Sequence, residues 1–422
     1  MNTYHHPPKA AQDCVEHDNR EEASEQSNSP LRSPEGVEIQ EIRDELSQRL
    51  PGGWVQDFLT WLSAAPYTGQ EPWYRRNVTD QLLEGLLKLL SGIWLAASAY
   101  YIGGWCWSLL PFGWACTVGG ARHLQVTIVH QCIHHRFTGI VGIDYRIGQL
   151  LTALLLVQDY VGYRHDHVLM HHKIRYFATI DDPDMAFLIS LGFLPGMTKA
   201  QLWRNLFWTM VSPRFHGMFL RARFRANFVN PSWSRIGLAC LLWLPVLVFT
   251  LWVNSWLFLL LVLAIPMGPL YHVSSLLQFV SEHYWLQVHQ DGEDALTQYA
   301  RHSHRRVLLA PAPPSDSPAL PKLVGWACWC GQIASMTLVR FTCLVGDLPV
   351  HDWHHLFPRD PQWPNAIWER EHRVHTHPVR GPLFQDTRGL LLAIDRCLGS
   401  ISAAPPLSGE LPKASASDCL GM

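Results

Sequence analysis

The chain has 422 residues, a formal net charge of −2 and a charged fraction of only 16%. Length alone would allow two or three soluble domains, but long stretches without any charged residue argue against that interpretation. The near-zero net charge offers no basic surface for nucleic acid, and ten scattered cysteines without a CxxC pair rule against a disulfide scaffold or a zinc ribbon.

The N-terminal part of the chain is polar over residues 1–32, which predicts disorder. Its first ten residues contain no apolar region, so we expect no cleavable signal peptide. Residues 33–81 predict two short helices. The first is capped by Ser33 with Pro34 at its first position, and the second follows Trp54. Spacing does not decide whether they lie on a membrane surface or pack on a cytoplasmic domain.

Two stretches, Leu89–Ala121 and Ile236–Ser281, contain no Asp, Glu, Lys or Arg. About 20 apolar residues cross a bilayer, so each stretch predicts a hairpin of two spanning helices. The hairpins would occupy residues 82–121 and 236–281 and turn near "YIGGW" and "WVNSW". Buried helices of a soluble core are disfavoured, because these rarely run beyond about 14 apolar residues without a polar face. We therefore predict an all-α, multi-pass membrane protein with about four spanning helices and a cytosolic helical cap.

Both hairpin turns are uncharged, whereas the segment from Arg164 to Arg235 carries ten Lys or Arg. Basic loops stay on the cytoplasmic side, which predicts that residues 122–235, residues 282–375 and both termini are cytoplasmic. Two shorter apolar segments, 147–157 and 323–339, are expected at the interface or inside the protein. Residues 376–422 form a C-terminal tail that we expect to be partly disordered.

The 23 histidines concentrate in "HQCIHH", "HDHVLMHH" and "HDWHH", with one more in "SEHYW". Residues four apart share a helix face, which predicts that His130 pairs with His134, His167 with His171, and His351 with His355. Nine imidazoles are too many for one zinc ion and suit two ions with four or five nitrogens each. Because HExxH is absent and only Glu369 to His372 has the ExxH spacing, a histidine-rich di-iron centre remains. The candidate ligands are His130, His134, His167, His171, His172, His283, His351, His354 and His355.

The order HxxxHH, HxxxHH and HxxHHLFP, split by a membrane hairpin, resembles the membrane fatty acid desaturase superfamily. That superfamily includes acyl-lipid desaturases, related hydroxylases and carotenoid ketolases. The resemblance runs from about residue 85 to about 375, and "HHKIRYFATIDDPD" looks like the tail of the second histidine box. It implies four spanning helices and a cytosolic helical domain that holds two irons. Three boxes and one isolated histidine would then supply the ligands: His130 and His134; His167, His171 and His172; His351, His354 and His355; and His283.

The resemblance also suggests residues around the ligands. Asp347 lies where better-understood members have an Asn that acts through a water, while His135 and His165 are extra histidines that could replace a neighbouring ligand. We expect His135 to orient a ligand and His165 to bond Asp181 or Asp182. Asp352 is a further supporting candidate. The remaining histidines of the C-terminal half are expected at the surface: His302, His304, His372, His375 and His377.

Membership would imply an O2-dependent reaction at unactivated C–H bonds, with two Fe ions as cofactors and O2 as co-substrate. The preferred hypothesis is desaturation of a fatty acyl or other lipid-like chain, with hydroxylation or ketolation as the alternative. No CxxCH or HPGG haem motif occurs, so electrons would come from a separate ferredoxin or cytochrome b5 type donor. The basic segment Arg214–Arg225 could dock that donor or the headgroups of membrane lipids.

A second hypothesis of another class is a non-catalytic, histidine-rich membrane protein that binds or transports metal. A transporter should carry polar or ionisable residues within its spans. The two hairpins have almost none except His272. This scarcity favours the enzyme.

Overall fold

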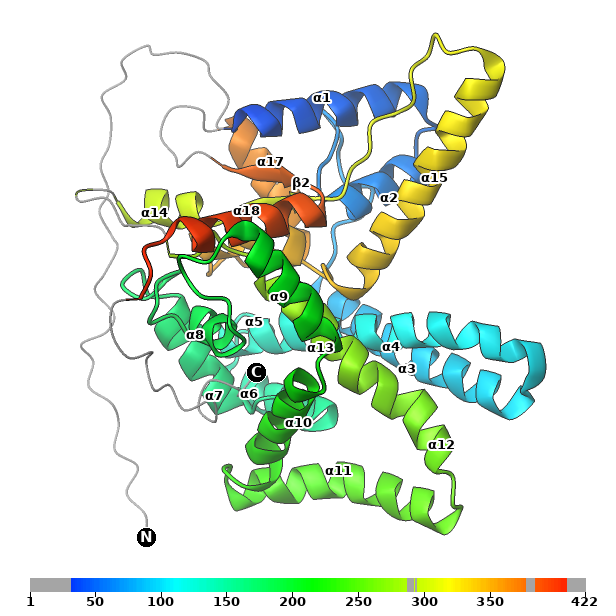
Figure 1. Cartoon of the computed structure of the whole chain (residues 1–422), viewed down its shortest axis with the longest axis vertical. Coiled ribbons are helices and arrows are strands. Elements are labelled where there is room, and N and C mark those ends of the chain that lie inside the picture. The colour runs from blue at the N-terminus through cyan, green and yellow to red at the C-terminus, as the bar shows by residue number, and fades with distance from the viewer. Residues whose placement is uncertain (1–31, 287–291, 293, 377–383, 408–422) are drawn as a thin grey trace.

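The computed structural model describes residues 32–286, 292, 294–376 and 384–407, which are mostly helical. The disorder predicted for residues 1–32 does not extend to Arg32, which is buried and paired with Glu371. Residues 1–31, the tail beyond residue 407 and His377 lie outside the described residues. Two helical hairpins extend to one side of the molecule, and the N- and C-terminal helices gather above the other side (Figure 1). Between these two parts lie the short helices that carry the histidines.

The first two helices form as predicted and pack on the cap. Helix α1 covers Pro34–Arg49, with the Ser33 side chain accepting a hydrogen bond from the backbone of Gly36. Its apolar face meets Val307 and Leu309, and α2 (Trp54–Ser63) follows it. Trp54 itself is 79% exposed, so it does not share the buried face of α2.

The first hairpin consists of α3 (Val78–Ile102), a 3₁₀ turn over Gly104–Leu109 and α4 (Leu110–His123). It turns at Gly103 and Gly104, both with positive φ, as the "YIGGW" stretch predicted. The two helices approach closely through small residues, a common solution for helices in lipid. A Cβ on Gly120 would overlap the backbone of Leu89, and one on Gly92 would overlap that of Thr117.

The second hairpin turns near "WVNSW" as predicted, between α11 (Trp233–Trp252) and α12 (Trp256–Leu259). Its returning arm is irregular, with π-helical segments at Leu260–Ala264 and Pro266–Leu270 before α13 (Tyr271–Phe279). Gly268 has non-helical backbone angles, φ −102° and ψ −108°. Prolines on both sides of it account for the kink.

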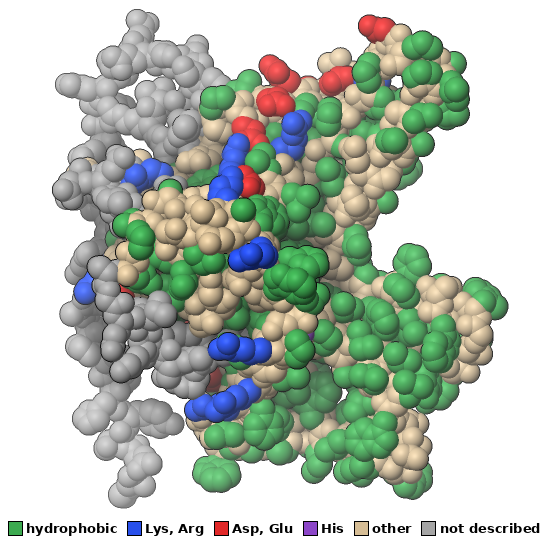
Figure 2. Space-filling view, in the orientation of Figure 1, with side chains coloured by type: hydrophobic (Ala, Val, Ile, Leu, Met, Phe, Trp, Pro, Cys, Tyr) green, Lys and Arg blue, Asp and Glu red, His purple; other side chains and the backbone are tan. Residues whose placement is uncertain are grey.

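Three described helices are long and apolar enough to cross a membrane, namely Val78–Ile102, Trp233–Trp252 and Trp256–Phe279. Helix α4 is not among them, because its 14 residues give way to a π-helical segment and include Arg122 and His123. Apolar side chains dominate the visible surface of both hairpins, whereas most charged ones lie over the rest of that face (Figure 2). A fourth span and the sidedness stay predictions.

The cap is built from short helices whose largest core cluster joins α8 (Pro183–Ser190), α9 (Lys199–Val211), α10 (Pro213–Phe228), α13 and α18 (Leu390–Ala403). The all-α expectation needs one correction, because β1 (Arg305–Val307) and β2 (Asp386–Arg388) pair in parallel. Buried ion pairs of Asp386 with Arg305 and Arg370 hold this ladder. The other cap helices are α14 (Ala295–His302) and α17 (Ala366–Thr376).

The two shorter apolar segments differ in how far they are packed inside the protein. Residues 147–157 fall largely in α6 (Val141–Leu155), which packs against α5 (His130–Ile133), α7 (Tyr160–Arg164) and α11. Residues 323–339 belong to α15 (Ala319–Thr342), which is largely exposed, with Leu320 at 71% and Leu323 at 67%. An interior position is therefore wrong for this second segment.

The close approach of α3 to α4 generates a prediction. In Gly120→Val the new side chain must displace the backbone of Leu89. Overpacking of this kind costs about 1 to 3 kcal/mol, so we expect a lower temperature of unfolding in detergent micelles. Gly237→Val is the matched control, since Gly237 lies on α11 with no atom within 4 Å of its Cβ position. Equal melting temperatures for both variants, measured by size-exclusion after heating, would contradict the packing argument.

Candidate metal centre

All nine predicted histidines converge in the structure, although they come from four segments of chain. The first box lies at α5 (His130–Ile133), directly after the π-helical segment Leu124–Val129. The second follows α7 (Tyr160–Arg164) in a π-helical turn over His165–His171. The third forms α16 (His351–Leu356), and His283 follows α13.

The nine imidazoles form two groups, in each of which all ligand nitrogens lie within 4.8 Å of one another. The first group has five members, His130, His134, His167, His172 and His354, and the second has four, His171, His283, His351 and His355. These sizes match the expectation of four or five nitrogens per ion. Whether these nitrogens bind metal stays a prediction.

Nitrogen-to-nitrogen distances show how tightly the rings converge. In the first group, Nε2 of His167 lies 2.8 Å from Nε2 of His130 and 3.1 Å from that of His172. In the second, Nε2 of His355 lies 3.0 Å from Nε2 of His351 and 3.3 Å from that of His171. Two imidazoles bound to one ion at about 2.1 Å and a right angle would have nitrogens about 3 Å apart. The spacing therefore fits metal ions between the rings.

The protonation state of the histidines also favours metal binding. Burial, followed by the proximity of other imidazoles, holds the pKa of His130, His167 and His354 well below the ordinary value. Neutral imidazole has the free lone pair that a metal needs. In addition, both ring nitrogens of His283 and Nδ1 of His355 are buried without a hydrogen-bond partner among the described residues. A bound cation would satisfy one nitrogen of His283, while His355 faces its group with Nε2.

The second box divides between the two groups. His167 and its predicted partner His171 do stack, with ring centroids 5.1 Å apart, but His172 joins His167 in the five-membered group and His171 belongs to the other group. The reason is the π-helical turn, in which the hydrogen bond runs from residue i to i+5 and residues five apart come onto one face. The backbone nitrogen of His172 donates to the carbonyl of His167, 2.9 Å away.

Carboxylates support the four-membered group. Nδ1 of His171 lies 2.8 Å from Oδ2 of Asp182 and 3.4 Å from Asp184, so its other nitrogen faces His355. Burial alone would lower the pKa of His171, but these two carboxylates outweigh it and raise the value to about 9. A carboxylate behind a ligating histidine fixes the ring orientation and strengthens the ligand.

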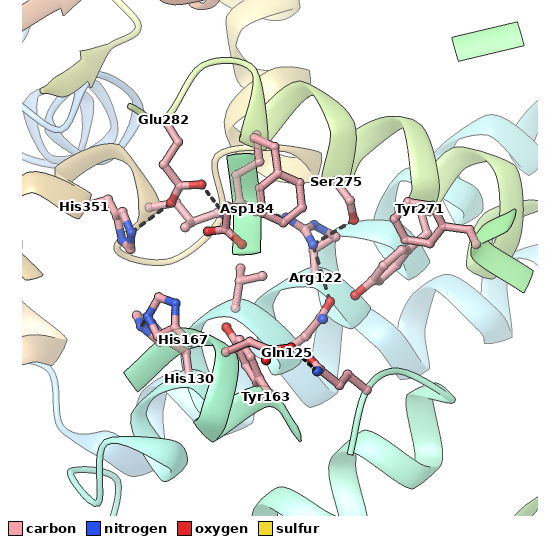
Figure 3. Close-up of a pocket in the computed structure, with 17 residues that line it drawn as sticks. Arg122, Gln125, His130, Tyr163, His167, Asp184, Tyr271, Ser275, Glu282 and His351 are labelled. Atoms are coloured by element: carbon pink, nitrogen blue, oxygen red, sulfur yellow. Dashed lines mark hydrogen bonds and ion pairs between the residues drawn. The ribbon is translucent and has the colours of Figure 1, made fainter. Parts of the chain in front are cut away.

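Sequence reasoning missed Glu282, whose Oε1 lies 2.9 Å from Nε2 of His351 (Figure 3). Burial would raise the pKa of Glu282, but His351 and other positive groups outweigh it and hold the value well below the ordinary one. A signal was present, because Glu282 is the first ionisable side chain after the charge-free stretch and directly precedes His283.

The four suggested supporting residues lie outside both groups. Nδ1 of His135 is 3.2 Å from the Tyr160 hydroxyl, and Asp352 accepts from Arg370 at 2.8 Å. Asp347 accepts at 3.4 Å from Gln131, which directly follows His130 in the first box.

The position of His165 differs from the expectation. His165 is mostly exposed and bonds Asp166 instead of Asp181 or Asp182. A surface position is wrong for His302 and His304, which are buried against Tyr284.

One comparison bears on the chain's class. The sequence model of the family described as Fatty acid desaturase matches residues 105–311. This match confirms the resemblance and places the matched part of the chain in the membrane fatty acid desaturase superfamily. It includes the first two boxes and His283 but ends before the third box, so the assembly of His351, His354 and His355 with the others is seen only in the structure. No curated protein matches the chain.

The Asp182–His171 pair generates a prediction. Asp182→Asn keeps one of the two oxygens that accept from the backbone of Ala178 and Asp184, and it removes the charge behind His171. Losing such a partner lowers metal affinity about 10- to 100-fold, so the variant should release metal at a correspondingly lower chelator concentration. Asp181→Asn is the matched control, one residue away and exposed. Identical chelator titrations for the two variants would show that Asp182 does not support a ligand.

Proposed function

We propose that the protein is an O2-dependent, membrane-bound di-iron oxidoreductase that removes hydrogen from unactivated C–H bonds of a lipid-like chain, with desaturation as the preferred outcome. The observation that carries this proposal is the convergence of nine imidazoles in groups of five and four. Its occurrence in a chain of the desaturase superfamily favours iron over zinc. Two bound irons would supply the oxidising power, with O2 as co-substrate.

The chain's own residues would hold and tune this centre. Five imidazoles would hold one ion and four the other, while Asp182 orients His171 and Glu282 accompanies His351. Seven of the nine histidines are at most 9% exposed, and three of these, His130, His167 and His351, line a small cavity of about 50 Å³. Exclusion of water protects an oxidising site from side reactions.

A larger apolar cavity supports a lipid-like substrate. It has a volume of about 920 Å³ and lies between α10, α11 and the irregular arm of the second hairpin. Its walls are almost entirely apolar and include Leu220, Phe224, Trp243 and Leu263. Sites of this size and lining accommodate ligands that are mainly hydrocarbon.

The electron donor belongs to the same proposal. With no haem motif in the chain, a separate ferredoxin or cytochrome b5 type protein would supply electrons, and the exposed Arg214 and Arg221 of α10 favour an acidic partner. Multi-pass insertion with the histidines facing the cytoplasm is supported by the apolar helices and by the basic segment between the hairpins.

The metal proposal is tested by iron content together with lipid profiles. Purified protein should contain about two irons per chain, and His354→Ala should lose iron from the five-membered group and abolish any lipid change seen in expressing cells. His165→Ala, which alters an exposed ring outside both groups, should keep both irons and the lipid change. Zinc alone in the protein, with an unchanged lipid profile for His354→Ala, would contradict the proposal.

The cavity proposal is tested by Gly268→Leu. Gly268 lines the apolar cavity, and no atom lies within 4 Å of its Cβ position. The larger side chain should therefore enter the cavity and shift the products toward shorter chains. Because the backbone angles of Gly268 lie outside the regions that residues with a Cβ favour, the size-exclusion profile of the variant in micelles is compared first with that of the unaltered protein. Gly217→Leu on α10 has equally open space outside the cavity and should leave the product profile unchanged. An identical chain-length profile for both variants would place the substrate elsewhere.

A further inference from the structure

Two buried arginines contact one tyrosine that lines the same small cavity as three metal-centre histidines. The guanidinium carbon of Arg223 is 4.4 Å from the ring centroid of Tyr271, and that of Arg122 is 5.3 Å from it. Arg122 is 2% exposed and Arg223 is 7% exposed. Neither is ion-paired with a carboxylate in the described parts of the chain. The structure therefore buries two positive charges without a direct counter-ion, which is unfavourable for the protein alone.

The hydrogen bonds of Arg122 and Arg223 are incomplete as well. Arg122 donates to the neutral side chains of Ser275, Gln278 and Gln125 (Figure 3), but its Nε has no partner among the described residues. Within the same part of the chain, Arg223 donates one hydrogen bond of good geometry, from Nη1 to the carbonyl of Met267, and its Nε and Nη2 lack such a partner. Two buried N–H groups of one guanidinium are thus available for an acceptor.

The nearby carboxylates are engaged elsewhere. Glu282 contacts His351 and accepts from Gln278, while Asp184 lies against His171. Asp166 accepts from Gln158 at 2.7 Å. Burial lowers the pKa of Arg223 to about 10, so the side chain is still charged at neutral pH. The missing negative charge must therefore come from outside the described chain.

The position of Arg223 indicates what kind of anion fits. Arg223 lines the apolar cavity, while the two rings it contacts, Tyr271 and Phe219, line the small cavity that His130, His167 and His351 also line. The guanidinium therefore stands in the wall between an apolar space of about 920 Å³ and the metal-centre histidines. A molecule filling this space would place hydrocarbon in the cavity and a negative group at its inner end.

We propose that Arg223, aided by the positive charge of Arg122, binds the carboxylate of an amphiphilic acid whose hydrocarbon chain lies in the apolar cavity. A planar carboxylate matches two adjacent N–H groups of a guanidinium. This inference rests on the proposed function in taking the acid as the substrate. It means that the carbons closest to the carboxylate lie nearest the histidines, and that a neutral lipid of the same length is a poor ligand.

The experiment measures binding rather than turnover. Radiolabelled decanoate and decanol are equilibrated by dialysis with the full-length protein in detergent micelles, with protein-free micelles as the blank. Decanoate should bind saturably and at least tenfold more tightly than decanol, because a charged hydrogen bond contributes about 1.5 to 3 kcal/mol, and 1.4 kcal/mol corresponds to tenfold in affinity. Equal binding of decanol and decanoate by the unaltered protein would overturn the proposal, and this comparison needs no variant.

Variants locate the carboxylate. Arg223→Gln should weaken decanoate binding at least tenfold and leave decanol binding unchanged, whereas Arg223→Lys, which keeps the charge, should restore part of the affinity. Arg214→Gln is the matched control, because Arg214 lies on the same helix, is exposed and does not line the cavity. Equal decanoate affinity in Arg223→Gln and Arg214→Gln would overturn the site.

The two proposals can fail separately. Selective decanoate binding by a protein that holds no iron would support the acid site and contradict the proposed function. Two irons and altered cellular lipids, together with equal binding of decanoate and decanol, would support the proposed function and overturn the acid site.

Discussion

The mutual approach of nine imidazole nitrogens is the constraint on which the rest of the structure depends. Neutral rings with nitrogens about 3 Å apart can satisfy only some of those nitrogens by hydrogen bonds to one another, because each ring has a single N–H to donate. Burial keeps water from the remaining ones. The arrangement is favourable when cations occupy the two groups, so metal binding and cap folding should be linked in free energy. The buried ion pairs of Arg305, Arg370 and Asp386 brace the third box from the other side.

Negative and positive side chains occupy different places around the histidine groups. Carboxylates at Asp182, Asp184 and Glu282 lie on the side of the four-membered group, while Arg122 and Arg223 lie toward the second hairpin. In the proposed enzyme the carboxylates would offset the positive charge of bound ions, whereas the arginines would face an acid in the apolar cavity. Residues that lie close together would then both stabilise the centre and select its ligand by charge.

Much of the outline could be predicted from the sequence, because it depends on local patterns. The two stretches without charged residues predicted both hairpins and their turns. Helical spacing correctly grouped His130 with His134 and His351 with His355. What failed depends on contacts between distant segments or on backbone that departs from α-helix. Glu282 meets His351 only in three dimensions, as Arg305 meets Asp386. Burial of His302 was hidden for the same reason, since its partner is the backbone of Tyr284.

In the π-helical turn at the second box, the spacing of the histidines in the sequence does not by itself determine which way each ring points. The number of residues between His167 and the following pair sets the chain length, whereas the winding of the backbone sets the direction of each ring. One additional residue can thus be absorbed as a wider turn without moving a ligand out of place. Divergent chains with unfamiliar box spacings can consequently preserve the same coordination geometry, and a search based on rigid spacing will overlook them.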